Sequence, residues 1–349
     1  MNRVLVAQAE DLKKSFDEKV ERYKSQLTQI NEQQRNIGEN YDSLLQDLVD
    51  KSTDELEIAC RSFEEGFEVN PAELKEIKIK FREEINPWYS RSYLMTRATV
   101  KPKGFPGDFE LLEGIYNDLP VIDEVEGERS RGIGLYLDRW FLDSHLAKAV
   151  RNRKDYMKEF LSDRIIERGG NGLDILNLAS GPCREWQELS NISSFKNVKL
   201  TCVDIDKLAL DYVDEKLKGL KEKGLELITA QDNIIKMALR KIEDVEEKYG
   251  LQDIVYSIGL FDYLSNPLLE KMISKGYNLL RKDGTFVLAF KDKGKYQTTR
   301  YDWLTDWIFQ PRNEESITKL LGLNGFSNEQ IKISREPLNT IIFYEIKKR

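Results

Sequence analysis

The sequence has little of what marks a secreted, metal-binding or membrane-spanning protein. Its three cysteines, Cys60, Cys183 and Cys202, are too few and too scattered for a disulfide framework or a zinc cluster. No apolar run reaches the length of about 18 residues that a transmembrane helix needs, and the first residues do not form a signal-peptide pattern. We therefore expect a cytoplasmic protein with free thiols, no bound metal and no stable membrane insertion.

Positive charge is also outweighed. The 54 Lys and Arg residues face 61 Asp and Glu residues, which gives a net charge of −7 and an isoelectric point near 5.3. No block of Lys and Arg is dense enough to follow a phosphate backbone, so a nucleic-acid partner is not expected. With 349 residues, 40% of them hydrophobic, the chain can fold as two domains or as one large domain with an elaboration.

The most informative stretch is LDILNLASGPCREW, residues 173–186, followed by LTCVDID, residues 200–206. A buried strand leads to Ser180 and Gly181, where the missing side chain lets the backbone approach a ligand and exposes the N–H groups that open a helix. The second strand ends at Asp204, 23 residues after Gly181. A carboxylate at about this spacing accepts hydrogen bonds from both hydroxyls of a ribose. The pattern predicts an adenosine-type ligand.

The same turn lacks the features of a phosphate site. It reads NLASGPCRE with one glycine, where a dinucleotide turn has GxGxxG, and no GxxxxGK[ST] loop is present. S-adenosylmethionine needs a ribose carboxylate but no phosphate cradle, because it carries a sulfonium and an amino-acid tail. At this point the chain resembles the class I methyltransferases, and S-adenosylmethionine is the predicted cofactor.

The rest of this half alternates strands with helical segments, which requires right-handed crossovers and a mostly parallel sheet. The further strands begin near Leu225, Asp253, Thr285, Gln330 and Thr340. The resemblance implies an α/β fold with a Rossmann-like, seven-stranded sheet whose seventh strand is antiparallel. An all-α extension is expected to precede it.

The resemblance also implies further cofactor contacts. By analogy, Asp232 or Asn233 meets the adenine amino group, and Ile205 and Ile234 pack on the adenine faces. A helix N-cap is the alternative use of Asp232 and Asn233. Four more cofactor-binding positions lie at the ends of the first and fourth strands: Asn177, Ala179, Ser257 and Gly259.

The first residues form amphipathic helices. Apolar side chains recur at three- and four-residue steps, namely Phe16, Val20, Tyr23, Leu27 and Ile30. SxxE at Ser52 predicts the start of a second helix, and Asn70 followed by Pro71 predicts a third. We favour a helical cap on the catalytic half over a dimeric coiled coil, since the heptad register is short. A homodimer through these helices is the competing use.

Residues 86–116 are rich in aromatic residues, proline, glycine and arginine. This composition predicts a poor helix or strand until about Asp108, and a folded loop instead of a disordered linker. The loop is either an ordered connector or a lid over the cofactor, with Arg97, Lys103 and Asp108 binding the charged groups of its methionine end. We therefore predict three parts: a helical extension over residues 1–85, a lid and connecting helix over 86–160, and a cofactor-binding domain over 161–349.

Several motifs sharpen the resemblance. KPKGFPGDFELLEGIY, AVRNRKDYM, NLASGPCRE, GLFDYL and DWIFQPRNEESITKLL are similar in order and spacing to bacterial class I methyltransferases of the 3-hydroxypalmitic acid methyl ester synthase type. That likeness covers about residues 85–349. The family resemblance implies methylation of the carboxylate of a hydroxy fatty acid, so a small-molecule acid is the expected substrate. Cys183, Phe105 and Pro106 depart from the usual pattern of that family.

Carboxylate methylation needs alignment more than proton transfer, because the nucleophile is already ionised. Cations or hydroxyl donors must orient it, and the candidates are Tyr263, Arg153 and Arg312, with Arg151 on the opposite side of one helix from Arg153. Tyr263 follows the carboxyl end of the fourth strand, where ligands of open α/β sheets bind. The lone histidine, His145, lies in a helical stretch and is a candidate base for a hydroxyl or amine nucleophile.

Two other functions fit the same sequence. One is an enzyme in which the cofactor's own amino or carboxylate group attacks carbon beside sulfur, which closes a small ring and releases methylthioadenosine. The other is a non-enzymatic cofactor-binding assembly protein whose N-terminal helices mediate association. Product analysis separates the first from methyl transfer, and absence of turnover identifies the second.

Overall fold

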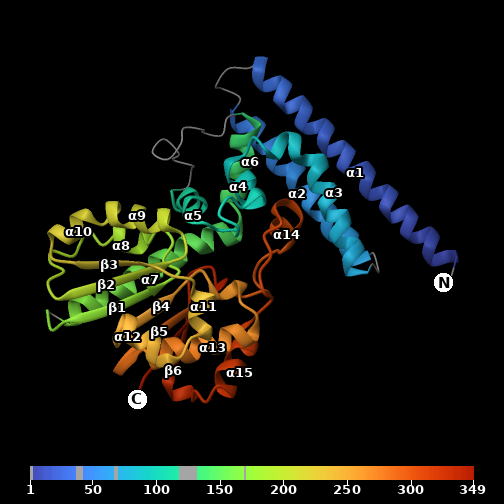
Figure 1. Ribbon diagram of the computed structural model, residues 1–349. Coiled ribbons are helices and arrows are strands. Elements are labelled where there is room, and N and C mark those ends of the chain that lie inside the picture. The colour runs from blue at the N-terminus through green and yellow to red at the C-terminus, as the bar shows by residue number, and fades with distance from the viewer. Residues whose placement is uncertain (1–2, 37–41, 67–69, 118–131, 169) are drawn as a thin grey trace. The chain divides into compact units, whose positions relative to one another are not determined.

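A computed structural model describes residues 3–36, 42–66, 70–117, 132–168 and 170–349 (Figure 1). The chain divides into two compact units. The helical unit comprises Met1–Gly107, Asn117–Ser144 and Gln297–Ile308, and the sheet unit comprises Asp108–Tyr116, His145–Tyr296 and Phe309–Arg349. The three-part division at residues 85 and 160 stays a prediction.

The sheet unit contains one seven-stranded sheet in the order β3-β2-β1-β4-β5-β7-β6. Its strands are β1 (Leu173–Leu178), β2 (Val198–Asp204), β3 (Glu226–Gln231), β4 (Gln252–Ser257), β5 (Leu280–Lys291), β6 (Ile331–Arg335) and β7 (Ile341–Lys347). The first five pair in parallel, and β7 runs antiparallel to both β5 and β6. The predicted Rossmann-like sheet with its antiparallel seventh strand is therefore confirmed, together with the helical region that precedes it.

Helices cover both faces of this sheet because the central strands β1, β2, β4, β5 and β7 are buried along most of their length, whereas the outer strands β3 and β6 are more exposed. They are α5 (Phe109–Tyr116), α7 (His145–Arg168), α8 (Arg184–Gln187), α9 (Lys207–Lys216), α10 (Lys218–Glu222), α11 (Ile234–Leu239), α12 (Ile242–Tyr249), α13 (Asn266–Asn278) and α15 (Glu314–Leu323). One hydrophobic core joins Leu176, Val255 and Phe286 of the sheet to α11, α12, α13 and α15. On the other face, Tyr156 of α7 stacks on Phe343 of β7 with ring centroids 3.8 Å apart.

The strand order places β1 between β2 and β4 (Figure 1). The connections leave β1 on one side and later return to its other side, so the β1/β4 boundary is the switch point of the topology. In open α/β sheets, ligands bind outside the carboxyl ends of the strands at such a point. The residues just after Leu178 and Ser257 therefore lie where a ligand is expected.

The helical unit is built on aromatic packing. Its helices are α1 (Arg3–Asn36), α2 (Asp42–Gly66), α3 (Pro71–Tyr89), α4 (Tyr93–Val100), α6 (Ile133–Leu142) and α14 (Thr299–Thr305). Every apolar position of the predicted amphipathic stretch from Phe16 to Ile30 is buried. Trp303 of α14 is packed edge-on against Phe16, Phe63 and Phe81. No helix in the described part of the chain combines the length and apolar character that crossing a bilayer requires.

The predicted helix start at Ser52 is wrong, whereas the start at Asn70 is confirmed. Helix α2 runs through Ser52 without a break, because the Ser52 hydroxyl donates to the Val49 carbonyl one turn back instead of capping a new helix. At the next helix, the Asn70 side chain accepts from the Ala72 N–H at 2.9 Å and Pro71 occupies the first helical position.

The segment 86–108 contains more helix than its composition predicts. Helix α3 continues to Tyr89, and Ser92 caps α4 by accepting from the Met95 N–H at 3.1 Å. Asp138 of α6 supports that cap, since its carboxylate accepts from the Ser92 hydroxyl and from the Leu94 N–H at 3.0 Å. Tertiary hydrogen bonds that no local pattern reveals thus stabilise α4.

Gly276 provides a test of packing in the sheet unit. A methyl group there would overlap the Phe286 ring, so Gly276→Ala should destabilise the protein by about 1–3 kcal/mol. The matched control is Gly322→Ala on α15, where a methyl meets nothing within 4 Å and helix propensity should add about 0.5–1 kcal/mol. Thermal unfolding followed by circular dichroism checks both. Equal melting temperatures of the two variants would contradict the described packing.

Candidate functional site

The loop that follows β1, Ala179–Cys183, is held in an unusual backbone conformation. Ala179, Gly181 and Cys183 have φ angles of 55°, 51° and 53°. Glycine adopts this left-handed conformation without strain, and the other two pay a steric cost that the surrounding contacts must offset. The loop is therefore a built feature at the carboxyl end of β1.

Asp204, the last residue of β2, ties this loop to the neighbouring strand. Its Oδ2 accepts from the Gly181 N–H at 2.8 Å, and its Oδ1 accepts from the Asp206 N–H at 2.9 Å. Asp204 is 6% exposed, and burial raises its pKa while the backbone N–H groups of Asp206, Gly181 and Ile205 oppose the rise. The carboxylate predicted to bind a ribose is thus fixed beside the glycine turn by backbone N–H groups on both sides of it.

Three buried polar atoms near the switch point have no hydrogen-bond partner among the described residues: Ser180 Oγ, Ser257 Oγ and Arg153 Nε. Ser180 belongs to the loop after β1, and Ser257 ends β4, the adjacent strand. Buried polar groups without partners are rare and costly in native proteins. The two serine hydroxyls at the ends of neighbouring strands, with Arg153 of α7 beside Gly259, fit a site that a polar ligand completes.

Glu185, which was not among the predicted site residues, stabilises the loop after β1 through hydrogen bonds from Asn177 and Cys183. Its buried carboxylate accepts from the Tyr256 hydroxyl at 2.6 Å and from Asn177 Nδ2 at 3.2 Å. Trp186 Nε1 donates to the Tyr256 oxygen at 2.9 Å, which leaves the tyrosine proton for Glu185. Burial raises the pKa of Glu185, and the hydrogen bond from the Tyr256 hydroxyl opposes the rise. Asn177, a predicted cofactor residue, is therefore held inside this network.

The residues predicted to surround the adenine differ in their availability. Ile205 is 47% exposed directly after Asp204, whereas Ile234 is buried in the hydrophobic core. Asn233 caps α11 by accepting from the Lys236 N–H at 3.0 Å, so the alternative use considered for it is present.

Asp232 is engaged by cations of its own chain. Arg240 reaches its two oxygens at 2.6 Å each, and Lys248 and Tyr249 donate at 2.7 Å. The Arg240 guanidinium is the main reason that the pKa of Asp232 lies far below its usual range. Its carboxylate supports the strand end and α12, and a role in adenine binding stays a prediction.

Tyr263 is presented by a short 3-10 turn, Phe261–Tyr263, that three connections hold. Arg312 donates to the carbonyls of Phe261, at 2.9 Å, and Leu264. The Asp262 carboxylate pairs with Lys291 at 2.6 Å, and the Gln310 N–H donates to the Asp262 carbonyl at 2.8 Å. Arg312, predicted to orient a substrate, has its guanidinium on backbone carbonyls and on Asn266 Oδ1, also at 2.9 Å. It therefore positions the turn that carries Tyr263.

Arg153 of α7 lies above Gly259, two residues after β4 ends. Its Nη2 donates to the Tyr116 hydroxyl at 3.2 Å, and its Nη atoms lie 3.7 and 3.8 Å from where a Cβ on Gly259 would be. The missing side chain of Gly259 thus leaves space beside a buried guanidinium. These two predicted site residues are brought together.

The other predicted site residues are placed as follows. His145 is exposed and begins α7, because the predicted helical stretch breaks at Asp143 and Ser144. Arg97 and Lys103 belong to the helical unit, where the Arg97 guanidinium lies 5.9 Å from the Tyr93 ring centroid. Asp108 belongs to the sheet unit and accepts from the Leu111 N–H at 2.9 Å at the start of α5. Their proposed contacts with a ligand stay predictions.

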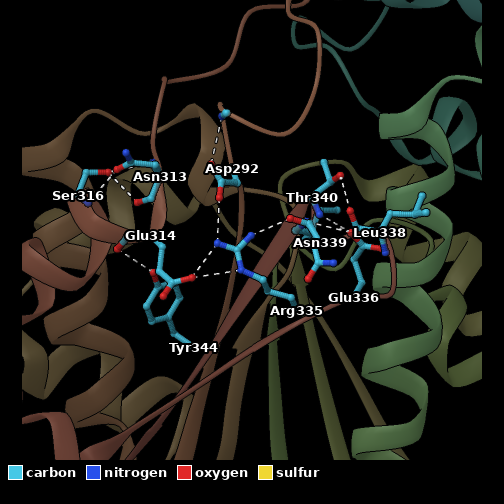
Figure 2. Close-up of polar contacts among 12 residues, drawn as sticks. Asp292, Asn313, Glu314, Ser316, Arg335, Glu336, Leu338, Asn339, Thr340 and Tyr344 are labelled. Carbon is cyan, nitrogen blue, oxygen red and sulfur yellow. Dashed lines mark hydrogen bonds and ion pairs between the residues drawn. The ribbon is translucent and has the colours of Figure 1, made fainter.

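A polar network anchors the chain where it leaves and re-enters the sheet unit (Figure 2). Arg335, the last residue of β6, pairs with Asp292 at 2.9 Å and with Glu314 at 2.7 Å. The Lys293 N–H donates to the Arg312 carbonyl at 2.8 Å, which joins the outgoing and returning segments. The network therefore fixes the residues adjacent to Lys291 and Arg312.

Comparison with known proteins bears on the fold. The sequence matches no family model and no curated protein. Among solved structures, a possible exported protein from Bordetella parapertussis is similar with a TM-score of 0.52 and 16% identity, over 69% of this chain and 79% of that one. Magnesium protoporphyrin IX methyltransferase from Synechocystis PCC 6803 with bound S-adenosylmethionine gives 0.42 and 16%, over 59% and 84%. N-methyltransferase from Bradyrhizobium japonicum WM9 gives 0.35 and 12%, over 56% and 97%. At these identities the likeness concerns the fold alone.

Lys291, Asp262 and Glu185 are the site residues that sequence reasoning missed. Lys291 closes an apolar strand, TFVLAFK, and Asp262 and Glu185 stand inside motifs that were noted for other residues. A charged residue at the end of a buried strand was the available signal. Among the residues that the structure describes, no group of three or more His, Cys, Asp or Glu side chains is arranged to hold a metal ion.

The ion pairs of Asp232 predict an acid-dependent stability. An aspartate has a pKa near 3.9 in unfolded chains and a lower one here, so its contribution is complete above about pH 4 and is lost as the pH falls further. Asp232→Asn should cost about 1–3 kcal/mol at pH 7 and flatten the acid side of the stability curve. Asp211→Asn, which removes an exposed pair with Lys207, should leave the curve unchanged. Urea unfolding between pH 3 and pH 7 measures both. An unaltered acid side in Asp232→Asn would contradict this assignment.

Proposed function

We propose that this protein transfers the methyl group of S-adenosylmethionine to a small-molecule acid, with O-methylation of a carboxylate as the reaction. The observation that carries the proposal is the pairing of the Gly181 N–H with Asp204 at the switch point of a methyltransferase-type sheet. This arrangement offers a ribose acceptor beside an open backbone turn. It offers no glycine-rich cradle for a pyrophosphate.

The residues present suit this cofactor. Asp204 would accept the ribose hydroxyls, the exposed Ile205 would cover one adenine face, and the Ser180 and Ser257 hydroxyls would find their missing partners in the ligand. When bound, the cofactor supplies an activated methyl group on a positively charged sulfur. Asn177, Ala179, Gly181 and Gly259 would shape the floor of its site, and Asp232 and Asn233 would border the adenine.

Methyl transfer to a carboxylate asks the protein to align the nucleophile and exclude water. Arg153 supplies a buried cation that can orient an anionic acceptor without a proton being moved. Tyr263 supplies a hydroxyl on a turn that Arg312 and Lys291 hold rigid. A hydroxyl or amine acceptor would need a base, and His145 is the candidate for that role. Because His145 is exposed, we favour an acid as the acceptor. Arg97, Lys103 and Asp108 remain proposed contacts of the methionine end.

Product analysis tests the function directly. Purified protein is incubated with methyl-labelled S-adenosylmethionine and 3-hydroxy fatty acids of several chain lengths, and the products are identified by mass spectrometry. S-adenosylhomocysteine and a labelled methyl ester are expected. Methylthioadenosine would instead indicate the cyclisation reaction, and no turnover with any acid or cell extract would favour a binding or assembly protein.

The role of Asp204 predicts a loss of affinity. Asp204→Ala removes charge-assisted hydrogen bonds of about 1.5–3 kcal/mol, so the Kd for S-adenosylhomocysteine should rise roughly 10- to 150-fold. Asp253→Ala is the matched control, because Asp253 lies near the start of β4, at the amino end of the parallel strands, and binds Arg281 at 2.7 Å. Calorimetric titration gives both constants. An unchanged Kd in Asp204→Ala would remove its ribose role.

Arg312 is expected to act on turnover through Tyr263. A lysine cannot hold the carbonyls of Phe261 and Leu264 together with Asn266, so Arg312→Lys should loosen the turn. A misplacement of about 1 Å costs on the order of 100-fold in rate, so kcat should fall by about that factor while the Kd for S-adenosylhomocysteine stays within about twofold. Tyr263→Phe should reproduce the split. Wild-type kcat in Arg312→Lys would contradict the positioning role.

A further inference from the structure

Arg153 is buried and incompletely paired. Its side chain belongs to a residue that is 3% exposed, and its Nε has no hydrogen-bond partner among the described residues. Its hydrogen bond from Nη2 goes to the neutral Tyr116 hydroxyl at 3.2 Å. A guanidinium with no carboxylate in contact is expensive to bury, because desolvation is then not offset.

A second buried cation lies nearby. Lys291 is 5% exposed at the end of β5 and pairs with Asp262, which is 2% exposed, at 2.6 Å. Its ammonium also lies 4.2 Å from the Phe309 ring centroid. Burial lowers the pKa of Lys291, Asp262 opposes this change, and the charge of Arg153 lowers the pKa further. The two cations are therefore close enough inside the sheet unit to repel each other electrostatically.

In the described part of the chain, the nearby carboxylates of Asp262 and Glu185 do not form an ion pair with Arg153. Asp262 is engaged twice by Lys291, through the ammonium and through the backbone N–H at 2.9 Å. The positive charge of Arg153 lowers the pKa of Glu185, but Glu185 Oε1 accepts hydrogen bonds from Tyr256 and Asn177 instead. Within the described residues, no ion pair joins Glu185 to Arg153. Beside the Arg153 guanidinium, Gly259 presents no side chain. The guanidinium thus lies beside the side-chain-free Gly259 after β4, and its Nε has no hydrogen-bond partner among the described residues.

We propose that Arg153, assisted by the Tyr116 hydroxyl and by the positive charge of Lys291, forms a binding site for the carboxylate of a ligand. A planar carboxylate matches the parallel N–H donors of a guanidinium. Two ligands of the proposed function carry this group: the amino-acid end of the cofactor and the acid that accepts the methyl group. The choice of these two ligands rests on the proposed function. The carboxylate site itself is inferred from the burial of Arg153 and from its unpartnered Nε.

Four probes separate the sources. S-adenosylhomocysteine carries a carboxylate and methylthioadenosine lacks it. A medium-chain 3-hydroxy acid carries one and its methyl ester does not. Calorimetry with the full-length protein measures the Kd of each probe for the wild type and for Arg153→Gln, Arg153→Lys and Lys291→Gln. Arg164→Gln on the same helix is the control, because Arg164 is 38% exposed and pairs with Glu167.

In Arg153→Gln, one carboxylate-bearing probe should bind roughly 10- to 100-fold more weakly, while its partner without the carboxylate binds as before. Weakening of S-adenosylhomocysteine assigns the site to the cofactor, and weakening of the hydroxy acid assigns it to the acceptor. Arg153→Lys, which keeps the charge but not the planar fork, and Lys291→Gln should give smaller losses of the same probe.

Equal weakening within a pair would mean that Arg153 acts only on structure, and unchanged binding of all four probes would also overturn the proposal. The wild type alone provides a further test if a variant fails to fold. Binding of both partners of each pair with equal affinity would show that no carboxylate is recognised. A protein that binds neither adenosine compound would refute the proposed function, and the acid and its ester would still test this site.

Discussion

One hydrogen bond organises the functional end of the sheet unit: the Gly181 N–H donates to the Asp204 carboxylate at 2.8 Å. It joins the loop after β1 to the end of β2, and the Ser180 N–H strengthens the link by donating to the Val203 carbonyl at 3.1 Å. Because Asp204 is buried, water does not compete for this hydrogen bond, and the carboxylate keeps its orientation. The loop after β1 and the end of β2 are thereby fixed relative to each other.

The turn after β4 is held by buried charge instead of by backbone geometry. Lys291, Asp262 and Arg312 fix the turn before Leu264, and the Arg335 network holds the segments on either side of the excursion into the helical unit (Figure 2). Buried ion pairs are costly for stability and valuable for defining a single geometry. These buried charges are concentrated around the turn that carries Tyr263.

The sequence alone predicted the sheet because the strands are short apolar runs bounded by turn residues. It predicted Gly181 and Asp204 as contacts of one adenosine-type ligand, and their direct hydrogen bond emerged only from the structure. It could not predict the partners of polar side chains. Asp232 has the residue type and position expected of an adenine contact, yet Arg240 and Lys248, which follow it in the sequence, donate to its carboxylate. Ser52 likewise has a capping pattern that a carbonyl within the same helix absorbs. Residue type and spacing reveal what a side chain can do, while the fold decides which neighbour it meets.

The central claim is that Gly181 and Asp204 together bind an adenosine that carries an amino-acid end and no phosphates. A crystal structure of the protein with S-adenosylhomocysteine tests it most directly. We predict electron density for the ribose at the Asp204 carboxylate, with the backbone of Gly181 against the ligand. An empty crevice at that position, or a pyrophosphate-bearing nucleotide bound there in preference, would contradict the account.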